Sequence, residues 1–419
     1  MKQLLPSLAF ALLLANCSPA RRIVRDLRTA PAYVNQQTGV SLYDPATGKY
    51  LIQHNADRPF TPASNTKLFS FYAGLLTLPD SLPTLRYVVR NDSLIFWGTG
   101  NPLLLHPDLP DTTALAFLRN RPETLFFSPA NYTGPRFGAG WSWDDYADDY
   151  SPELSPLPIY GNVARFEKGQ ISPRRFVDSV AVNQITKGIR RNEFSNRFTV
   201  PAKPDADGQD VPFRWSAELV AQLLTDTLHR PVGVVRLPMP PNTQLLRGTP
   251  TDSLYKRMLV VSDNLFAEQV HFMTSAERQT GQLDPVGERK RMMDSVLQYP
   301  AVAAKWIDGS GLSRYNLFTP NALIDLLTKL ANRVPQKRLF ALLPVAGRSG
   351  TLRSLNLPGE PYIFAKSGSM SGVYNLSGYL LTKKEKVLYF SVMNNNFTGS
   401  VSAVRKQTGE LLKQIHERF

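Results

Sequence analysis

Segments with strand-forming composition stand near both ends of this chain, and they constrain its fold more than any other feature. The first two flank a turn whose proline and glycine suit a β-hairpin. The last three precede residues 401–418, which have the pattern of an amphipathic helix. With helical patterns between them, this order fits an antiparallel sheet with helices packed on it, so we predict an α+β fold. The predicted strands cover residues 39–43, 49–54, 361–365, 376–382 and 386–393.

The middle of the chain contains a stretch of different character. Residues 85–235 are rich in prolines and short strand candidates, including a hairpin around Asn91, and we predict an inserted, mostly β subdomain there. A length of 419 residues allows this second domain beside a discontinuous main domain, residues 21–84 and 236–419. Helices are expected within residues 21–38, 61–76, 217–227, 254–274, 289–297 and 321–331.

The first residues have the features of an export signal. Lys2 precedes an apolar stretch, residues 4–14, that is too short to cross a bilayer and is typical of a signal-peptide core. Cys17, the only cysteine of the chain, follows in a segment that resembles a bacterial lipobox. We therefore expect residues 1–20 to direct export to the periplasm and Cys17 to be lipidated, which would anchor the protein to the outer membrane. A plain secretory signal with a chance cysteine is the alternative.

The chain is basic, with 48 Lys and Arg against 34 Asp and Glu and a formal net charge of +14. Such a charge attracts anionic surfaces or substrates. The basic residues are nevertheless scattered, and the longest unbroken basic run is residues 289–291. Because the sequence contains no nucleic-acid-binding motif, an ordinary basic surface is the simpler interpretation, and we expect no nucleic-acid partner.

Two Ser-x-x-Lys strings occur, at Ser64–Lys67 and at Ser253–Lys256, and their surroundings separate them. Ser64 begins a segment with the pattern of a buried helix, whereas Ser253 lies in a polar segment. Serine and lysine at positions i and i+3 share one helix face. At a helix N-terminus the backbone N–H groups can stabilise a developing anion, and a desolvated lysine near another cation can act as a general base. Ser64 and Lys67 are therefore the candidate nucleophile and base.

Two further strings would complete such a site. Ser262 and Asn264, in a Ser-Asp-Asn string, offer a hydroxyl and a carboxamide two residues apart. Residues 366–368 form the only Lys-Ser-Gly or Lys-Thr-Gly string, at a predicted strand where a glycine lets a substrate backbone approach closely. Each string alone has an ordinary explanation as a solvated loop or a strand end. Their order along the chain, each on a suitable element, favours one shared active site.

Together the three strings resemble the active-site motifs of penicillin-binding proteins and serine β-lactamases. Their surroundings are more specific and resemble the class C low-molecular-weight penicillin-binding proteins, the DacB-like family of D-alanyl-D-alanine carboxypeptidases and endopeptidases. The resemblance covers about residues 30–415. It implies the transpeptidase-like fold of that class, an α/β sandwich in which helices flank an antiparallel sheet. The segments that carry it are residues 62–67, 98–102, 308–314, 319–320, 343–347 and 350–352.

The resemblance also implies roles for individual residues. Ser64 would attack the bond between two D-alanines of a peptidoglycan stem peptide, and Lys67 would take its proton. The oxyanion would lie between the backbone N–H groups of Ser64 and Ser369, while Ser262, linked to both lysines, would relay a proton to the leaving amine. β-Lactams mimic this substrate and would acylate Ser64. The substrate-binding residues implied in this way are Asn264, Lys366, Ser367 and Gly368.

Two other functions stay open at this point. A serine β-lactamase or esterase on the same scaffold would share the three strings, and a wall-binding lipoprotein could keep the fold without catalysis. The sequence does not separate carboxypeptidase from endopeptidase action, because both cleave next to a D-alanine. The five histidines show no metal-binding spacing, so we expect neither a metal nor another cofactor.

Overall fold

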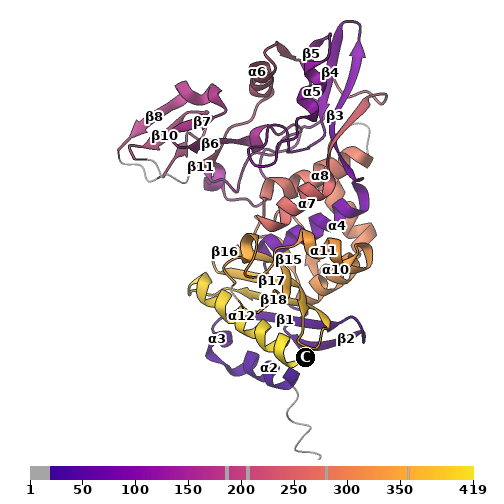
Figure 1. The fold of residues 1–419 in the computed structure, drawn as a ribbon, viewed down its shortest axis with the longest axis vertical. Helices are drawn as coiled ribbons and strands as arrows, with labels where there is room; N and C mark the ends of the chain where they lie inside the picture. Colours follow the sequence, from indigo (N-terminus) through magenta and orange to yellow (C-terminus); the bar gives the residue numbers. More distant parts are fainter. Residues whose placement is uncertain (1–18, 185–187, 204–207, 279–281, 356, 358) are drawn as a thin grey trace, which may run out of the picture.

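The computed structural model describes residues 19–184, 188–203, 208–278, 282–355, 357 and 359–419. The lower part of Figure 1 contains a five-stranded antiparallel sheet in which strands from both ends of the chain pair with each other. Val40 in β1, an interior strand, lies opposite His54 on one side and Val392 on the other. The predicted first hairpin and the predicted last three strands are thus present. The sheet order is β16 (Ile363–Met370), β17 (Val373–Leu381), β18 (Val387–Asn395), β1 (Gln37–Asp44) and β2 (Lys49–His54).

Helices cover both faces of this sheet, because side chains that alternate along each strand feed two different cores. On one face, Leu376 and Phe390 pack with apolar residues of α2 (Pro19–Thr29) and α12 (Val401–Arg418). In Figure 1 these two helices lie together at the lower end of the molecule. The chain therefore has a layered α+β architecture around one central sheet.

The opposite face of the sheet carries the larger helical core. Tyr379 and Met393 project into it from the strands, and Phe69 and Phe71 fill it from α4 (Lys67–Thr77). α4 is apolar on nearly every side, which is why it lies at the centre of this layer and not at its surface. The helices around it are α7 (Thr251–Val260), α8 (Asn264–Arg278), α9 (Pro285–Arg291), α10 (Pro320–Arg333) and α11 (Gln336–Leu342), with a π-turn at Met292–Leu297 and a short β14–β15 ladder (Ala304–Lys305, Leu317–Phe318).

The predicted helix over residues 254–274 is wrong as a single element. α7 ends at Val260 and α8 begins at Asn264, the last residue of the Ser-Asp-Asn string, and Ser262 takes the left-handed conformation with φ 66°. The Asp263 carboxylate accepts a hydrogen bond from the Phe266 N–H at 3.1 Å, which starts a new helix. Because a left-handed residue cannot continue a helix, the string lies in a sharp turn that projects Ser262.

Two other helix starts differ from expectation. The predicted N-terminal helix over residues 21–38 is interrupted, and α3 (Pro31–Val34) begins anew at Pro31, which has no N–H to continue α2. Thr61 does not cap the nucleophile segment, because the first turn, η1 (Ala63–Thr66), is a 3₁₀ turn whose N-cap is Pro62. The sheet holds this turn instead: Thr61 N–H donates to Asn395 at 2.7 Å, and its carbonyl accepts from Asn375 at 2.8 Å.

Residues between α4 and α7 form the upper part of Figure 1 and have a hydrophobic core of their own. The predicted hairpin around Asn91 is present, with Val89 opposite Leu94. Besides its strands, the described part of this region contains two α-helices, α5 (Thr113–Arg119) and α6 (Ala217–Leu228), and the first of these was not expected. Its sheets are β12-β5-β4-β3-β13 (Val232–Val234, Thr124–Phe127, Ser93–Gly98, Ser81–Arg90, Gln244–Pro250), β8-β10-β9 (Val180–Asn183, Phe198–Pro201, Arg190–Arg191) and β11-β6-β7 (Gln209–Pro212, Val163–Glu167, Gln170–Ser172).

Within the ranges given above, no helix is both long and apolar enough to span a membrane. Residues 1–18, which include Cys17 and most of the predicted export signal, lie outside the described residues.

Candidate active site

Ser64 and Lys67 meet where η1 runs into α4. Lys67 Nζ lies 2.9 Å from Ser64 Oγ, and the lysine side chain is completely buried. Nζ also donates to Asn264 Oδ1 at 2.6 Å and to the Ser310 carbonyl oxygen at 2.7 Å. Nζ thus faces three oxygen atoms, one of which belongs to the candidate nucleophile.

Burial is the main influence on the acidity of Lys67. It lowers the pKa of this lysine from 10.5 to about 8, and the carboxylates of Asp308, Asp263 and Glu268 oppose the shift only in part. A neutral amine that points at a hydroxyl can accept its proton, so this pair has the chemistry of a general base and a nucleophile.

The turn between α7 and α8 brings the second string to the same place. Ser262 Oγ accepts a hydrogen bond from Lys366 Nζ at 2.9 Å. In the part of the chain that the structure describes, its predicted link to Lys67 is not among the hydrogen bonds, so Ser262 is joined to one lysine and not to both. Asn264 joins Lys67 through its Oδ1, while its Nδ2 donates to the Tyr150 carbonyl oxygen at 2.8 Å.

The third string lies on β16, an edge strand of the central sheet. Gly368 is needed there for a reason that the sequence did not indicate. A Cβ at this position would lie 2.4 Å from the Pro62 carbonyl oxygen and 3.0 Å from the Ser64 nitrogen. The close approach is therefore between β16 and the nucleophile turn, and it brings the strand that carries Lys366 and Ser369 alongside Ser64.

Lys366 is a second buried cation in the site. Burial, and next to it the charge of Lys67, lowers the pKa of Lys366 well below its usual range. Its Nζ donates to Ser262 Oγ and to the Ser367 carbonyl oxygen, the latter at 2.7 Å. Ser367 Oγ donates to Thr351 Oγ1 at 2.7 Å, which adds to the site a hydroxyl for which we had predicted no role.

Part of the predicted site borders a cavity of about 600 Å³ between the central sheet and the loop of residues 140–150. Ser64, Ser262, Asn264 and Ser369 line it together with Tyr150 and Arg314. A larger cavity of about 830 Å³ lies between β6, β7 and β10, but it shares no lining residue with the first and contains none of the predicted site residues. Among the described residues, no cluster of three or more His, Cys, Asp or Glu side chains could hold a metal ion.

The turn at residues 308–313 is the main part of the site whose role the sequence did not reveal. Its segment had been singled out for resemblance, yet its contribution is a backbone carbonyl, that of Ser310, which any residue type could provide. The Asp308 carboxylate shapes the turn by accepting the Gly311 N–H at 2.8 Å and the Ser313 N–H at 2.6 Å. It also accepts the Trp141 indole N–H at 2.9 Å, which ties the loop of residues 140–150 to the turn.

Comparison with known proteins agrees with the family resemblance that the sequence motifs indicated. A family model described as D-Ala-D-Ala carboxypeptidase 3 (S13) matches residues 21–415. A D-alanyl-D-alanine carboxypeptidase from an Actinomadura species is 26% identical over 88% of this chain and 79% of its own length. The D-alanyl-D-alanine carboxypeptidase DacB of Haemophilus influenzae is 29% identical over 46% of this chain and 43% of its own.

Solved structures agree on the fold. Penicillin binding protein 4 (dacB) from Haemophilus influenzae matches with a TM-score of 0.75 at 20% identity, covering 94% of this chain and 99% of that one. A predatory peptidoglycan endopeptidase from Bdellovibrio bacteriovorus matches with a TM-score of 0.52 at 15% identity, covering 91% and 93%. At such identities the likeness concerns the fold alone, and it confirms the predicted fold class.

Proposed function

The chain belongs to the D-Ala-D-Ala carboxypeptidase 3 (S13) family, and on this premise we propose that it cleaves peptidoglycan stem peptides between two D-alanines through an acyl-enzyme on Ser64. The observation that carries the proposal is the buried Lys67, with Nζ 2.9 Å from Ser64 Oγ. Because the pKa of Lys67 is lowered to about 8, an appreciable fraction of the amine is neutral near physiological pH.

In the proposed first step, Ser64 Oγ attacks the carbonyl carbon of the penultimate D-alanine as Lys67 takes the hydroxyl proton. The oxyanion binds between the backbone N–H groups of Ser64 and Ser369, two residues that line the same cavity. Collapse of the tetrahedral intermediate breaks the peptide bond, and Ser262 gives a proton to the departing amine. Lys366, which donates to Ser262 Oγ, replaces that proton and regains one from Lys67 by way of solvent, so that both lysines return to their starting protonation states. Water then hydrolyses the ester and regenerates Ser64.

The same proposal assigns recognition of the terminal carboxylate to Lys366 and Ser367. An approaching carboxylate favours the charged form of a lysine, so binding of the substrate would itself protonate Lys366. Asn264 is proposed to hold the substrate amide, and Gly368 keeps β16 close enough to the nucleophile turn for Ser369 to take part. β-Lactams, which carry a carboxylate beside a reactive amide, are proposed as acylating inhibitors.

Labelling with a fluorescent penicillin tests this function. The wild type and Ser64→Ala are incubated with the probe, separated on a gel and analysed by peptide mass spectrometry. A stable adduct on the Ser64 peptide that is absent from the variant is the expected result. No adduct on folded protein would favour the non-catalytic alternative, and turnover without an adduct would favour a β-lactamase.

A second assay separates the two peptidase activities that the family resemblance left open. A synthetic stem pentapeptide ending in D-Ala-D-Ala and a cross-linked stem-peptide dimer are supplied in parallel. Release of D-alanine from the first at the faster rate supports carboxypeptidase action, and faster opening of the dimer supports endopeptidase action. Ser64→Ala is the control for both, since either activity needs the same acyl-enzyme.

The domain division and the cellular location are further proposals. Residues 85–235 are proposed as an inserted subdomain between the two parts of the peptidase domain, residues 21–84 and 236–419, and the separate core of this region supports the division. Export to the periplasm with a lipid on Cys17 is proposed from the sequence alone. Release of Cys17→Ser from the membrane fraction, with the wild type retained there, would support the anchor.

A further inference from the structure

Behind Lys67, a polar cluster extends from Asn264 to residues that have no part in the chemistry described so far. α8 presents Asn264, Glu268 and His271 on one face, at positions i, i+4 and i+7, and this face packs against α4. Asn264 contacts Lys67 directly, and His271 Nε2 lies 3.0 Å from Ser70 Oγ, which is one turn further along α4. Glu268 lies between these two contacts, yet its carboxylate makes its hydrogen bond elsewhere.

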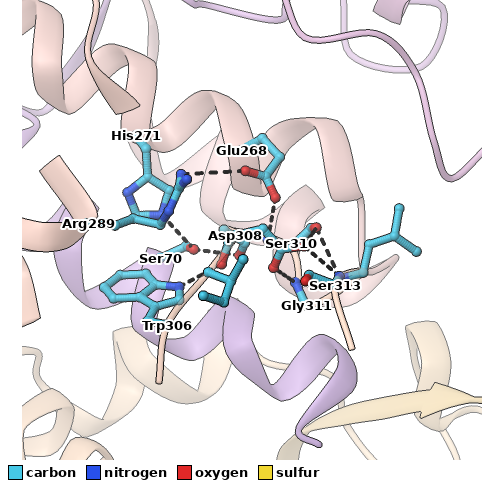
Figure 2. A network of polar contacts seen from close by, with 12 residues as sticks. Ser70, Glu268, His271, Arg289, Trp306, Asp308, Ser310, Gly311 and Ser313 are labelled. Atoms are coloured by element: carbon cyan, nitrogen blue, oxygen red, sulfur yellow. Dashed lines mark hydrogen bonds and ion pairs between the residues drawn. The ribbon is translucent and has the colours of Figure 1, made fainter. Parts of the chain in front are cut away.

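The turn at residues 308–313 connects Glu268 to Lys67. The Ser310 N–H donates to Glu268 Oε1 at 2.7 Å, the contact drawn in Figure 2. The carbonyl oxygen of the same residue accepts from Lys67 Nζ at 2.7 Å. Both Ser310 and Glu268 are buried, so water does not compete for either bond. The carbonyl of Ser310 lies in the next peptide plane, whose Gly311 N–H donates to Asp308 Oδ1 at 2.8 Å. Glu268 holds the plane before Ser310 and Asp308 the plane after it, so the two carboxylates together fix where the Ser310 carbonyl points.

The bonds around Nζ show why that carbonyl matters. Asn264 Oδ1 and the Ser310 oxygen can only accept hydrogen bonds, so each must receive an N–H from Lys67. This requirement is the same for the neutral amine and for the ammonium. The remaining position on Nζ, an N–H in the ammonium and the lone pair in the amine, is left facing Ser64 Oγ. Without the carbonyl, the lone pair is free to turn away.

We propose that Glu268 is a positioning residue for the general base: it holds the Ser310 carbonyl against Lys67, which keeps the lone pair of the neutral amine on Ser64. This inference rests on the proposed role of Lys67 as the base. Glu268 touches neither the reacting atoms nor the cavity, and its hydrogen bond reaches the base through Ser310.

The charge of Glu268 gives the proposal a second signature. Arg289 Nη1 on α9 lies 3.7 Å from Glu268 Oε2, as Figure 2 shows, while burial raises the pKa of the carboxyl group. Glu268 is also one of the carboxylates that raise the pKa of Lys67 against the effect of burial. Its loss should therefore lower the pKa of Lys67 further. The charged groups that face Lys67 are Asp263, Glu268, Asp308 and Lys366.

Two variants of the full chain separate the hydrogen bond from the charge. Glu268→Gln keeps the size and a carbonyl oxygen for the Ser310 N–H but has no charge, whereas Glu268→Met keeps the size and offers no oxygen acceptor. For each, the limiting rate of acylation by a fluorescent penicillin and the dissociation constant of the initial complex are measured from about pH 6 to pH 10.

We expect Glu268→Gln to acylate within about threefold of the wild type at the plateau, with the midpoint of its acid limb at a lower pH. We expect Glu268→Met to lose at least about tenfold in limiting rate, since small misplacements of a catalytic group are costly. Its dissociation constant should stay within about twofold, because Glu268 does not line the cavity.

Glu288→Gln is the matched control. Glu288 is another buried carboxylate, paired with Arg291 at 2.7 Å, and it lies on α9 next to the residue that faces Glu268. It has no hydrogen bond to the 308–313 turn among those of the described residues. We expect it to acylate like the wild type whatever its cost in thermal stability, which is measured for all variants.

The outcomes distinguish this inference from the proposed function. If the wild type is not acylated at Ser64, the proposed role of Lys67 as the base is wrong, and the premise of this inference fails with it. A wild type that is acylated, with Glu268→Met at the same limiting rate, overturns the positioning role alone. Equal losses in Glu268→Met and Glu288→Gln would reduce the effect to general stability and overturn it as well. Should Glu268→Met not fold, an unshifted acid limb in Glu268→Gln overturns the coupling to Lys67.

Discussion

The pH dependence of acylation follows directly from the burial of Lys67. With a pKa of about 8, roughly a tenth of the amine is neutral at pH 7 and roughly nine-tenths at pH 9. The acylation rate should therefore rise about tenfold over this interval and then level off. A lysine with an unperturbed pKa of 10.5 would gain about 100-fold over the same interval and would not level off below about pH 10. The shape of the pH–rate profile thus shows whether burial lowers the pKa of Lys67.

The assay is stopped-flow acylation of the wild type by a fluorescent penicillin, with the limiting rate extracted at each pH. The limiting rate is preferred because loss of charge at Lys366 at high pH would weaken binding of the penicillin carboxylate. The titration of Lys67 does not itself destabilise the fold at high pH, because the pKa of Lys67 is lower in the folded than in the unfolded chain. Between about pH 8 and 10.5 the unfolded chain binds more protons, so this group favours folding increasingly, by on the order of 3 kcal/mol in total.

A limiting rate that still climbs about eightfold between about pH 9 and pH 10 would refute the reasoning, since the base would then be a lysine with its ordinary pKa of 10.5. A flat profile from about pH 6 to pH 10 would refute it equally, because no group near pKa 8 would control the step. Ser64→Ala, measured over the same range, corrects for the spontaneous hydrolysis of the penicillin at alkaline pH.

Other substitutions test particular contacts. Thr351→Val removes the acceptor of the Ser367 hydroxyl, and we expect the dissociation constant for penicillin to rise about threefold to tenfold in stopped-flow titrations, with little change in melting temperature. Gly311→Ala adds a Cβ 1.9 Å from the Ala63 carbonyl oxygen at a residue with φ 84°; we expect a loss of about 3 kcal/mol or more in urea denaturation and of at least about 100-fold in acylation. Tyr379→Phe removes a buried hydrogen bond of 2.8 Å within the core; it should lower the free energy of unfolding by about 1 kcal/mol and leave acylation unchanged.

Much of the fold could be predicted because local patterns and tertiary structure agree in the central domain. The strands near both ends of the chain, most of which are buried on both faces, and the amphipathic helix over residues 401–418 have compositions that the sequence displays directly. The break between α7 and α8 could not be predicted in this way, since the apolar periodicity runs across it. A single side-chain contact from Asp263 and the conformation of Ser262 make the break, and hydrophobic periodicity carries no information about either.

The site shows a similar division between side chains and backbone. Ser64, Lys67, Ser262 and Lys366 could be selected because their chemistry is specific to their side chains, and the structure brings them together. The Ser310 carbonyl could not be selected, because every residue has a carbonyl and only the folded turn directs one at Lys67. The position of Glu268, four residues after Asn264 on the same helix, was a signal available in the sequence, but it was not used.

The pairing of β1 with β18 has a consequence for the newly made protein. Ser64 leaves the ribosome well before Gly368, on the strand against which its turn packs, and before Asn395, the β18 residue that binds Thr61. A sheet closed by contacts so distant in sequence can form only after β16 and β18 have been synthesised. Until then the nascent chain carries Ser64 without the packed neighbours of the folded site. The reactivity of the serine and the closure of the sheet are thereby acquired in a single folding event.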